Sequence, residues 1–122
     1  DLCRRQRQMC IRDRNKNILK AMKKISKDGG IPMVSLFISG RPLIVDQELN
    51  LSDAFVSLWL PGTAVEGIND VIFTDNQNNI KYDFSGKLPF SWPSKNSNNP
   101  LNIKQKEYYP LYKFGYGLTY QD

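Results

Sequence analysis

Met33-Val-Ser-Leu-Phe-Ile38 and Ala54-Phe-Val-Ser-Leu-Trp-Leu60 are two short stretches that are almost continuously apolar. The first ends at Ser39-Gly40 and the second at Pro61-Gly62. Apolar runs of this length between turn residues are typical of strands covered on both faces, as in a parallel sheet between helix layers. We therefore predict two neighbouring parallel strands in the interior, joined by a crossover through the polar residues 46–53.

A helix is predicted before the first strand, over residues 15–28. Its apolar side chains fall at helical spacing and form one stripe, whereas its lysines mostly point elsewhere. Gly29-Gly30 supplies a left-handed stop, and Pro32 prevents the helix from resuming. The stripe consists of Ile18, Leu19, Met22 and Ile25.

A second helix is predicted from Thr63 to about Thr74. Thr63 is placed to cap it, with Glu66 three residues later as the partner in a capping box. The residues expected on its apolar face are Val65, Ile68, Val71 and Ile72.

This order of elements indicates an α/β fold: a partial three-layer sandwich with a mostly parallel sheet. Two or three strands are fewer than sheets of this kind usually have. The sheet is therefore expected to lack its first strands, upstream of residue 15. The Asn-, Ser- and Lys-rich stretch 94–106 is expected to be a surface loop.

Composition and charge narrow the class of protein. The 122 residues carry 40% hydrophobic and 11% aromatic side chains and a net charge of +5, which suits a packed globular unit. Residues 1–14 hold five arginines and two aspartates, a net +3, and the remaining 12 basic and 10 acidic residues give only +2. This distribution disfavours a nucleic-acid binder. No apolar run reaches the length of a membrane span.

Residues 1–14 also contain both cysteines, Cys3 and Cys10. Their spacing fits no common zinc pattern, and the chain has no histidine, so no metal site is expected. We predict that residues 1–14 are a non-native or unstructured extension and that residues 15–122 are the domain. A natural extension of the following helix is the alternative.

The end of the chain resembles a known family. The stretches that carry the resemblance are Lys87-Leu-Pro-Phe-Ser-Trp-Pro93 and Pro110-Leu-Tyr-Lys-Phe-Gly-Tyr-Gly-Leu-Thr-Tyr120, preceded by Ile38-Ser-Gly-Arg-Pro42, Ser52 to Gly62 and Gly67-Ile-Asn-Asp-Val-Ile-Phe73. In this order they resemble the second domain of family 3 glycoside hydrolases, the β-glucosidases and exo-β-glucan glucohydrolases. The sequence of residues 49–55 and 82–88 is most similar to that of the bacterial exo-1,3/1,4-β-glucan glucohydrolases.

The resemblance implies the C-terminal part of a six-stranded α/β sandwich that packs against a catalytic barrel. The parent would be a retaining, exo-acting enzyme that needs no cofactor and is periplasmic or secreted. Its partners would be a β-glucan or β-glucoside substrate and the barrel of the same protein, with no nucleic acid and no membrane span.

Retaining hydrolysis needs two carboxylates about 5 Å apart. By resemblance the nucleophile lies in the barrel and the acid/base lies upstream of residue 15. Glu48, Glu66 and Glu107 do not form a convincing pair, so we predict that this chain contains no catalytic, cofactor-binding or metal-binding residue and is inactive alone. Ala64 stands where relatives usually have glutamate, and Tyr109 stands where they often have aspartate.

Four aromatic residues have two interpretations each. Trp59, Trp92, Tyr116 and Tyr120 are tempting sugar-stacking residues, but core or domain packing is favoured for all four. Gly115 and Gly117 alternate with the tyrosines and suggest a close approach of backbone.

A second function remains open from the residues alone. A phosphate- or nucleotide-binding α/β module could use Ser39-Gly40-Arg41 or Pro61-Gly62-Thr63 at a helix start. Neither has the glycine spacing of a dinucleotide or P-loop site.

Overall fold

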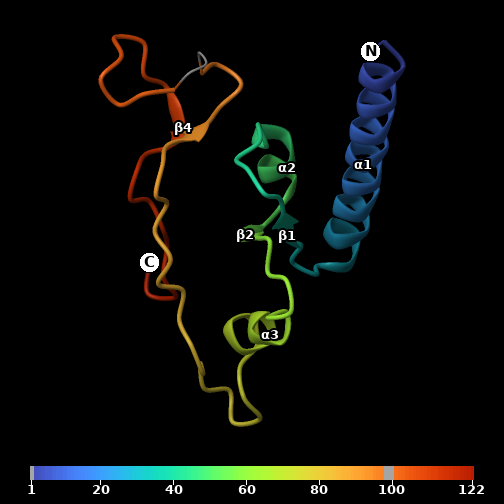
Figure 1. Ribbon diagram of the computed structural model, residues 1–122. Coiled ribbons are helices and arrows are strands. Elements are labelled where there is room, and N and C mark those ends of the chain that lie inside the picture. The colour runs from blue at the N-terminus through green and yellow to red at the C-terminus, as the bar shows by residue number, and fades with distance from the viewer. Residues whose placement is uncertain (1, 98–100) are drawn as a thin grey trace. The chain divides into compact units, whose positions relative to one another are not determined.

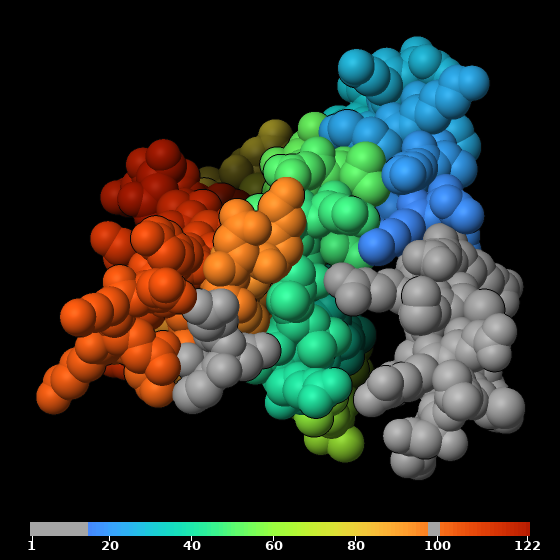
Figure 2. Space-filling model, turned by 90° about the horizontal axis from the view of Figure 1, so that it is seen from above, coloured from blue at the N-terminus to red at the C-terminus, as the bar shows by residue number. Residues whose placement is uncertain are grey.

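The computed structural model describes residues 2–97 and 101–122, and side chains are described for 15–97 and 101–122 (Figure 2). The described residues form three helices and four strands in sequence order (Figure 1). They are α1 (Leu2–Gly29), β1 (Val34–Ile38), α2 (Asp46–Leu51), β2 (Ala54–Trp59), α3 (Glu66–Ile72), β3 (Trp92–Pro93) and β4 (Pro110–Tyr112).

The chain divides into two units, which are described separately. The first unit comprises residues 1–37 and 45–57, and the second comprises residues 38–44 and 58–122. The buried hydrophobic side chains of the described residues are Met33 and Val45 in the first unit and Trp92 in the second. Within the residues whose side chains are described, few hydrophobic side chains are therefore fully buried.

The predicted pair of parallel strands is confirmed. β1 and β2 form a two-stranded sheet. At one end the Asp53 amide donates to the Met33 carbonyl (2.8 Å), and at the other the Ser39 amide donates to the Trp59 carbonyl (3.2 Å). Because both strands advance in the same direction between these two bonds, the pair is parallel. The intervening crossover contains α2, so the segment is a βαβ unit and the fold class is α/β as predicted.

The prediction that β1 is covered on both faces is wrong for this chain. Successive side chains of a strand point to opposite faces. Ser35 and Phe37 are half-buried and contact Ser52 and Phe55 respectively. The alternate residues Val34, Leu36 and Ile38 are 49%, 48% and 61% exposed. An unbroken apolar run therefore does not show that both faces of a strand are buried, because the described residues leave about half of the surface of these side chains uncovered.

The predicted helix over residues 15–28 is confirmed as part of α1, but its packing face differs from the prediction. The half-buried side chains lie at i, i+3, i+7 and i+10, namely Lys16, Leu19, Lys23 and Ser26. Three residues of the predicted stripe are exposed, at 48% for Ile18, 51% for Met22 and 70% for Ile25. The helix face in contact is thus set by α2 and Asp53, not by the apolar stripe.

Residues 1–14 keep their interpretation as a prediction. α1 begins at Leu2, but the side chains of residues 2–14 lie outside the described ones, as does residue 1. Searched over the described part of the chain, the helices include none with both the length and the apolarity for a bilayer crossing.

The predicted second helix is found as α3, but the capping box is not. α3 begins at Glu66, with Val65 as an N-cap that makes no side-chain hydrogen bond. Thr63 lies inside a turn closed by the Ala64 amide and the Pro61 carbonyl (3.0 Å). Thr63 therefore lies in the turn that precedes α3 and is not the residue that caps the helix. Ile68, Val71 and Ile72 are half-buried as expected.

β3 and β4 form a second, antiparallel sheet in which Trp92 pairs with Tyr112 and Pro93 with Pro110. The register shifts between the two pairs, as expected where prolines lack the amide that a ladder needs. Between α3 and β3 the chain forms no regular element, and the C-terminal segment runs back alongside it (Figure 1).

Candidate functional site

The carboxyl ends of β1 and β2 are where an open α/β sheet usually meets its ligand. Two loops leave the sheet there, residues 39–41 and 60–64, and both belong to the second unit. The Ser39 amide is bonded to the Trp59 carbonyl, which ties the start of the first loop to the end of β2. A Cβ added at Gly40 would come within 3.2 Å of the Leu60 Cδ1 atom. The loops are therefore neighbours, and a side chain at position 40 would crowd the Leu60 side chain.

The first loop uses its own polar groups. The Ser39 hydroxyl donates to the Arg41 carbonyl (2.7 Å) and accepts from the Arg41 amide (3.3 Å). A hydroxyl engaged in such a turn is not presented to a phosphate. The Arg41 side chain is exposed.

The second loop begins with an unusual backbone conformation at Trp59. Its φ is 55°, in the left-handed region that bulky residues rarely adopt. Gly62 follows with φ 57°, which glycine tolerates without strain. A non-glycine residue held in this region costs about 1–3 kcal/mol, so the surroundings must stabilise it.

An aromatic cluster holds Trp59. Its ring centroid lies 5.4 Å from that of Phe90 in an edge-on arrangement and 5.4 Å from that of Trp92. Trp92 is 3% exposed, and its indole Nε1 donates to the Leu43 carbonyl (2.8 Å). The predicted packing role of both tryptophans is confirmed. Such aromatic pairs contribute about 0.5–1.5 kcal/mol each beyond burial.

The expected close approach of backbone near the C-terminus is found at Gly117. A Cβ built there would overlap the Gly86 carbonyl oxygen. Gly115 has open space around it but a φ of 79°, so glycine is favoured there because of the backbone conformation. Leu88 exchanges backbone hydrogen bonds of 2.8 Å with Gly115 and Tyr116, which joins the segment before β3 to the C-terminal segment.

The tyrosines of the closing motif pack within the second unit. Tyr116 stacks on Tyr112 with centroids 4.3 Å apart, and Tyr120 contacts Phe84 at 5.2 Å. The Tyr120 hydroxyl donates to the Val71 carbonyl of α3. Burial, and next the neighbouring Tyr116, raise the pKa of the Tyr112 phenol above its usual value.

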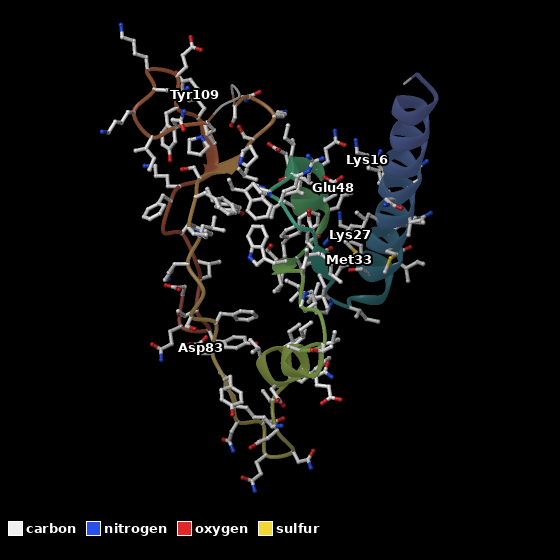
Figure 3. All side chains as sticks on the ribbon, viewed as in Figure 1. Lys16, Lys27, Met33, Glu48, Asp83 and Tyr109 are labelled. Carbon is white, nitrogen blue, oxygen red and sulfur yellow. The ribbon has the colours of Figure 1, made fainter. Side chains whose placement is uncertain are left out.

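Asp83 also holds the C-terminal segment (Figure 3). Its Oδ1 atom accepts from the Tyr120 amide (2.9 Å) and from the Phe84 amide (2.6 Å). Lys87 adds a bond from Nζ to the Gly117 carbonyl (2.5 Å). Through these contacts the closing motif packs against residues 83–88 and has a structural role.

The three candidate glutamates occupy unrelated positions. Glu48 lies in the first turn of α2 (Figure 3) and Glu66 in the first turn of α3. Carboxylates at such positions stabilise helix N-termini. Glu107 is exposed in the loop before β4. Within the described residues there is no group of three or more acidic, cysteine or histidine side chains that could hold a metal. That none of the three glutamates is catalytic remains a prediction.

Ala64 and Tyr109, where the sequence departs from its relatives, are both exposed. The Ala64 amide closes the turn with Pro61. The Tyr109 carbonyl accepts hydroxyl hydrogen bonds from Ser94 (2.9 Å) and Ser97 (2.6 Å). Tyr109 therefore stabilises the loop through its backbone carbonyl, and these hydrogen bonds do not depend on its side chain.

Sequence reasoning missed Asp53. Its Oδ1 atom accepts from Lys23 Nζ (2.6 Å) and its Oδ2 atom from the Met33 amide (2.7 Å). The hydrogen bond from Lys23, followed by that from Met33, lowers the pKa of the Asp53 carboxyl below 3.8. The available signal was an aspartate directly before an apolar strand.

Comparisons with known proteins agree with this architecture. The model of the glycosyl hydrolase family 3 C-terminal domain matches residues 6–120. A periplasmic beta-glucosidase of Salmonella typhimurium is 34% identical in an alignment 116 positions long, and the match covers 77% of this chain and 14% of the relative. The chain thus spans about one seventh of the length of that relative.

Solved structures give the same result. The exo-1,3/1,4-beta-glucanase ExoP of a Pseudoalteromonas species is 50% identical, with a TM-score of 0.75, both in its native form and as a point mutant. The match covers 88% of this chain and 13% or 17% of those chains. The chain therefore belongs to glycosyl hydrolase family 3, as part of that family's C-terminal domain.

Proposed function

We propose that these residues serve in a retaining, exo-acting β-glucosidase or β-glucan glucohydrolase, where they supply structural and pocket-rim parts and not the catalytic carboxylates. The observation that carries the proposal is the 50% identity to an exo-1,3/1,4-beta-glucanase over 88% of the chain. The parent would release glucose from β-glucan ends by two carboxylates outside this chain, without a cofactor. A periplasmic or secreted location is proposed from the periplasmic relative.

The domain division is part of the same proposal. Residues 15–122 would be the C-terminal portion of the sandwich domain, which packs against the barrel of the same protein. The exposed faces of β1 and α1 support this, because large exposed apolar areas mark sites covered by other protein. Val34, Leu36, Ile18, Met22 and Ile25 are all about half exposed or more.

The phosphate-binding alternative is weakened by two observations. The Ser39 hydroxyl is engaged within its own turn. α3 begins at Glu66 and not at Gly62, so the Pro61–Thr63 turn does not open a helix, and the first helical turn carries a negative charge that repels an anion.

A domain exchange tests the proposed function. Residues 15–122 would replace the matching segment of the Pseudoalteromonas exo-glucanase, and hydrolysis of a nitrophenyl β-glucoside and of a β-1,3-glucan would be measured. We expect activity within about tenfold of the unaltered enzyme, because the segment supplies scaffold and rim and leaves both carboxylates of the host in place. The first sugar released should have the β configuration, as retention requires.

Deletion of the segment from the same enzyme is the control, and it should abolish activity. A chimaera that folds, with the circular dichroism and elution volume of the host, but has no activity would contradict the proposed function. So would full activity of the deletion variant.

A further inference from the structure

Trp59 has an unusual backbone conformation and a packed side chain at the point where the chain leaves β2. It is a bulky residue with left-handed backbone at the carboxyl end of β2 (φ 55°), its indole lies against Phe90 and Trp92, and Leu60, the next residue, is 70% exposed. The left-handed backbone of Trp59 is unfavourable, and such strain persists where the surroundings enforce it.

The aromatic cluster explains how the strain is maintained. Trp92 is buried and fixed by its hydrogen bond to the Leu43 carbonyl, so it offers Trp59 a rigid surface. The Trp59 carbonyl accepts from the Ser39 amide. The indole and the carbonyl are therefore both held, and the left-handed conformation lets the chain turn out of the strand immediately afterwards.

This arrangement of Trp59 fixes the position of residues 60–64. The chain turns at Pro61 and Gly62 and closes on the Ala64 amide, beside the loop of residues 39–41. Arg41 and Thr63 are exposed on these two loops, and their guanidinium and hydroxyl groups can bind sugar hydroxyls. Both loops leave the carboxyl ends of parallel strands, the edge at which such sheets meet ligands.

We infer that Trp59 is a positioning residue: its left-handed backbone, locked by Phe90 and Trp92, sets the 60–64 turn as a contact for the bound glucan. The inference rests on the proposed function. In this inference the indole of Trp59 holds the turn in place, and the turn contacts the substrate.

The first test concerns the backbone and needs only the 122-residue chain. Trp59→Gly and Trp59→Ala both remove the indole, but only alanine keeps a Cβ in the left-handed region. We expect the glycine variant to unfold at the higher urea concentration. In an ordinary strand alanine is the more stable of the two, so that order would overturn the inference.

The second test uses the chimaera with the exo-glucanase. Trp59→Ala should raise KM for the β-glucan by about tenfold with kcat unchanged, because the turn contacts substrate and not the reacting bond. Trp59→Phe keeps an aromatic ring against Phe90 and Trp92 and should restore KM to within about threefold of the unaltered chimaera. Tyr82→Ala, at a tyrosine that is 63% exposed, is the matched control and should leave both constants unchanged.

The pattern of constants separates positioning from stability. A variant that only unfolds more easily has fewer active molecules, so its apparent kcat falls and its KM does not change. That result, or unchanged constants, would overturn the inference. If the unaltered chimaera is inactive, the proposed function fails instead, and the order of the glycine and alanine variants still decides the backbone question.

Discussion

Lys23 and Asp53, thirty residues apart, are joined by a 2.6 Å ion pair that fixes α1 to the start of β2. Asp53 also accepts the Met33 amide (2.7 Å), and Met33 is one of the buried hydrophobic residues. One carboxylate thus organises a helix, a crossover and the first strand of the first unit.

Asp53→Ala should lower the urea midpoint of unfolding more than Lys23→Met does. The aspartate variant loses both partners and leaves a part-buried amide unsatisfied, whereas the lysine variant loses only an exposed ion pair, which is usually a small loss. Lys20→Met on the exposed side of α1 is the control and should change little. An equal loss for Asp53→Ala and Lys23→Met would show that the Met33 hydrogen bond does not matter.

The stabilising effect of Asp53 should depend on pH. Its pKa is lowered in the folded chain, so its contribution is fully present above the unfolded value of 3.8 and is lost as the pH falls through the lowered folded value. The difference in midpoint between the unaltered chain and Asp53→Asn should therefore be constant from about pH 7 to about 5 and shrink below about 4. A difference that grows on acidification would contradict the assignment.

Three glycines should respond differently to alanine. Gly117→Ala is expected to destabilise by about 1–3 kcal/mol through overlap with the Gly86 carbonyl. Gly115→Ala should lose about 1–2 kcal/mol because of its positive φ. Gly67 lies in α3 with open space around it, so Gly67→Ala should raise the free energy of unfolding by about 0.5–1 kcal/mol. Urea unfolding ranks the three, and a stable Gly117→Ala variant would show that the two segments do not approach.

Deletion of residues 1–14 should change the free energy of unfolding by less than about 0.5 kcal/mol, the usual range for surface changes. The reason is the prediction that this segment is a foreign or unstructured extension. Urea unfolding of residues 15–122 beside the whole chain measures the difference. A loss of several kcal/mol would instead identify the segment as a native, packed part of α1.

The chain alone should release no nitrophenol from a nitrophenyl β-glucoside. Glycosidic bond cleavage needs a positioned acid and a nucleophile, and the family's two carboxylates are expected outside residues 15–122. Purified chain and buffer are compared over the same period. Turnover that Glu48→Gln, Glu66→Gln or Glu107→Gln abolishes would assign catalysis to this chain and overturn the expectation.

Local pattern was sufficient to predict β1, β2, α3 and the described part of α1 as element types. The apolar runs at 33–38 and 54–60 predicted two neighbouring parallel strands, and the helical spacing of Ile18 to Ile25 predicted the helix over residues 15–28, which is the last part of α1. These features depend on neighbouring residues alone, because strand and helix periods are set by the local backbone. The helix α2 in the crossover was not predicted. The close approach of backbone that was expected at Gly115 and Gly117 is present only at Gly117, because it depends on Gly86.

Only the tertiary structure decided which faces are covered and where the backbone is strained. The exposure of Val34 and Met22, the pairing of Lys23 with Asp53 and the left-handed Trp59 all depend on partners distant in sequence. Periodicity reports that a side chain is apolar, whereas burial requires another part of the protein to cover it, and that is determined by packing.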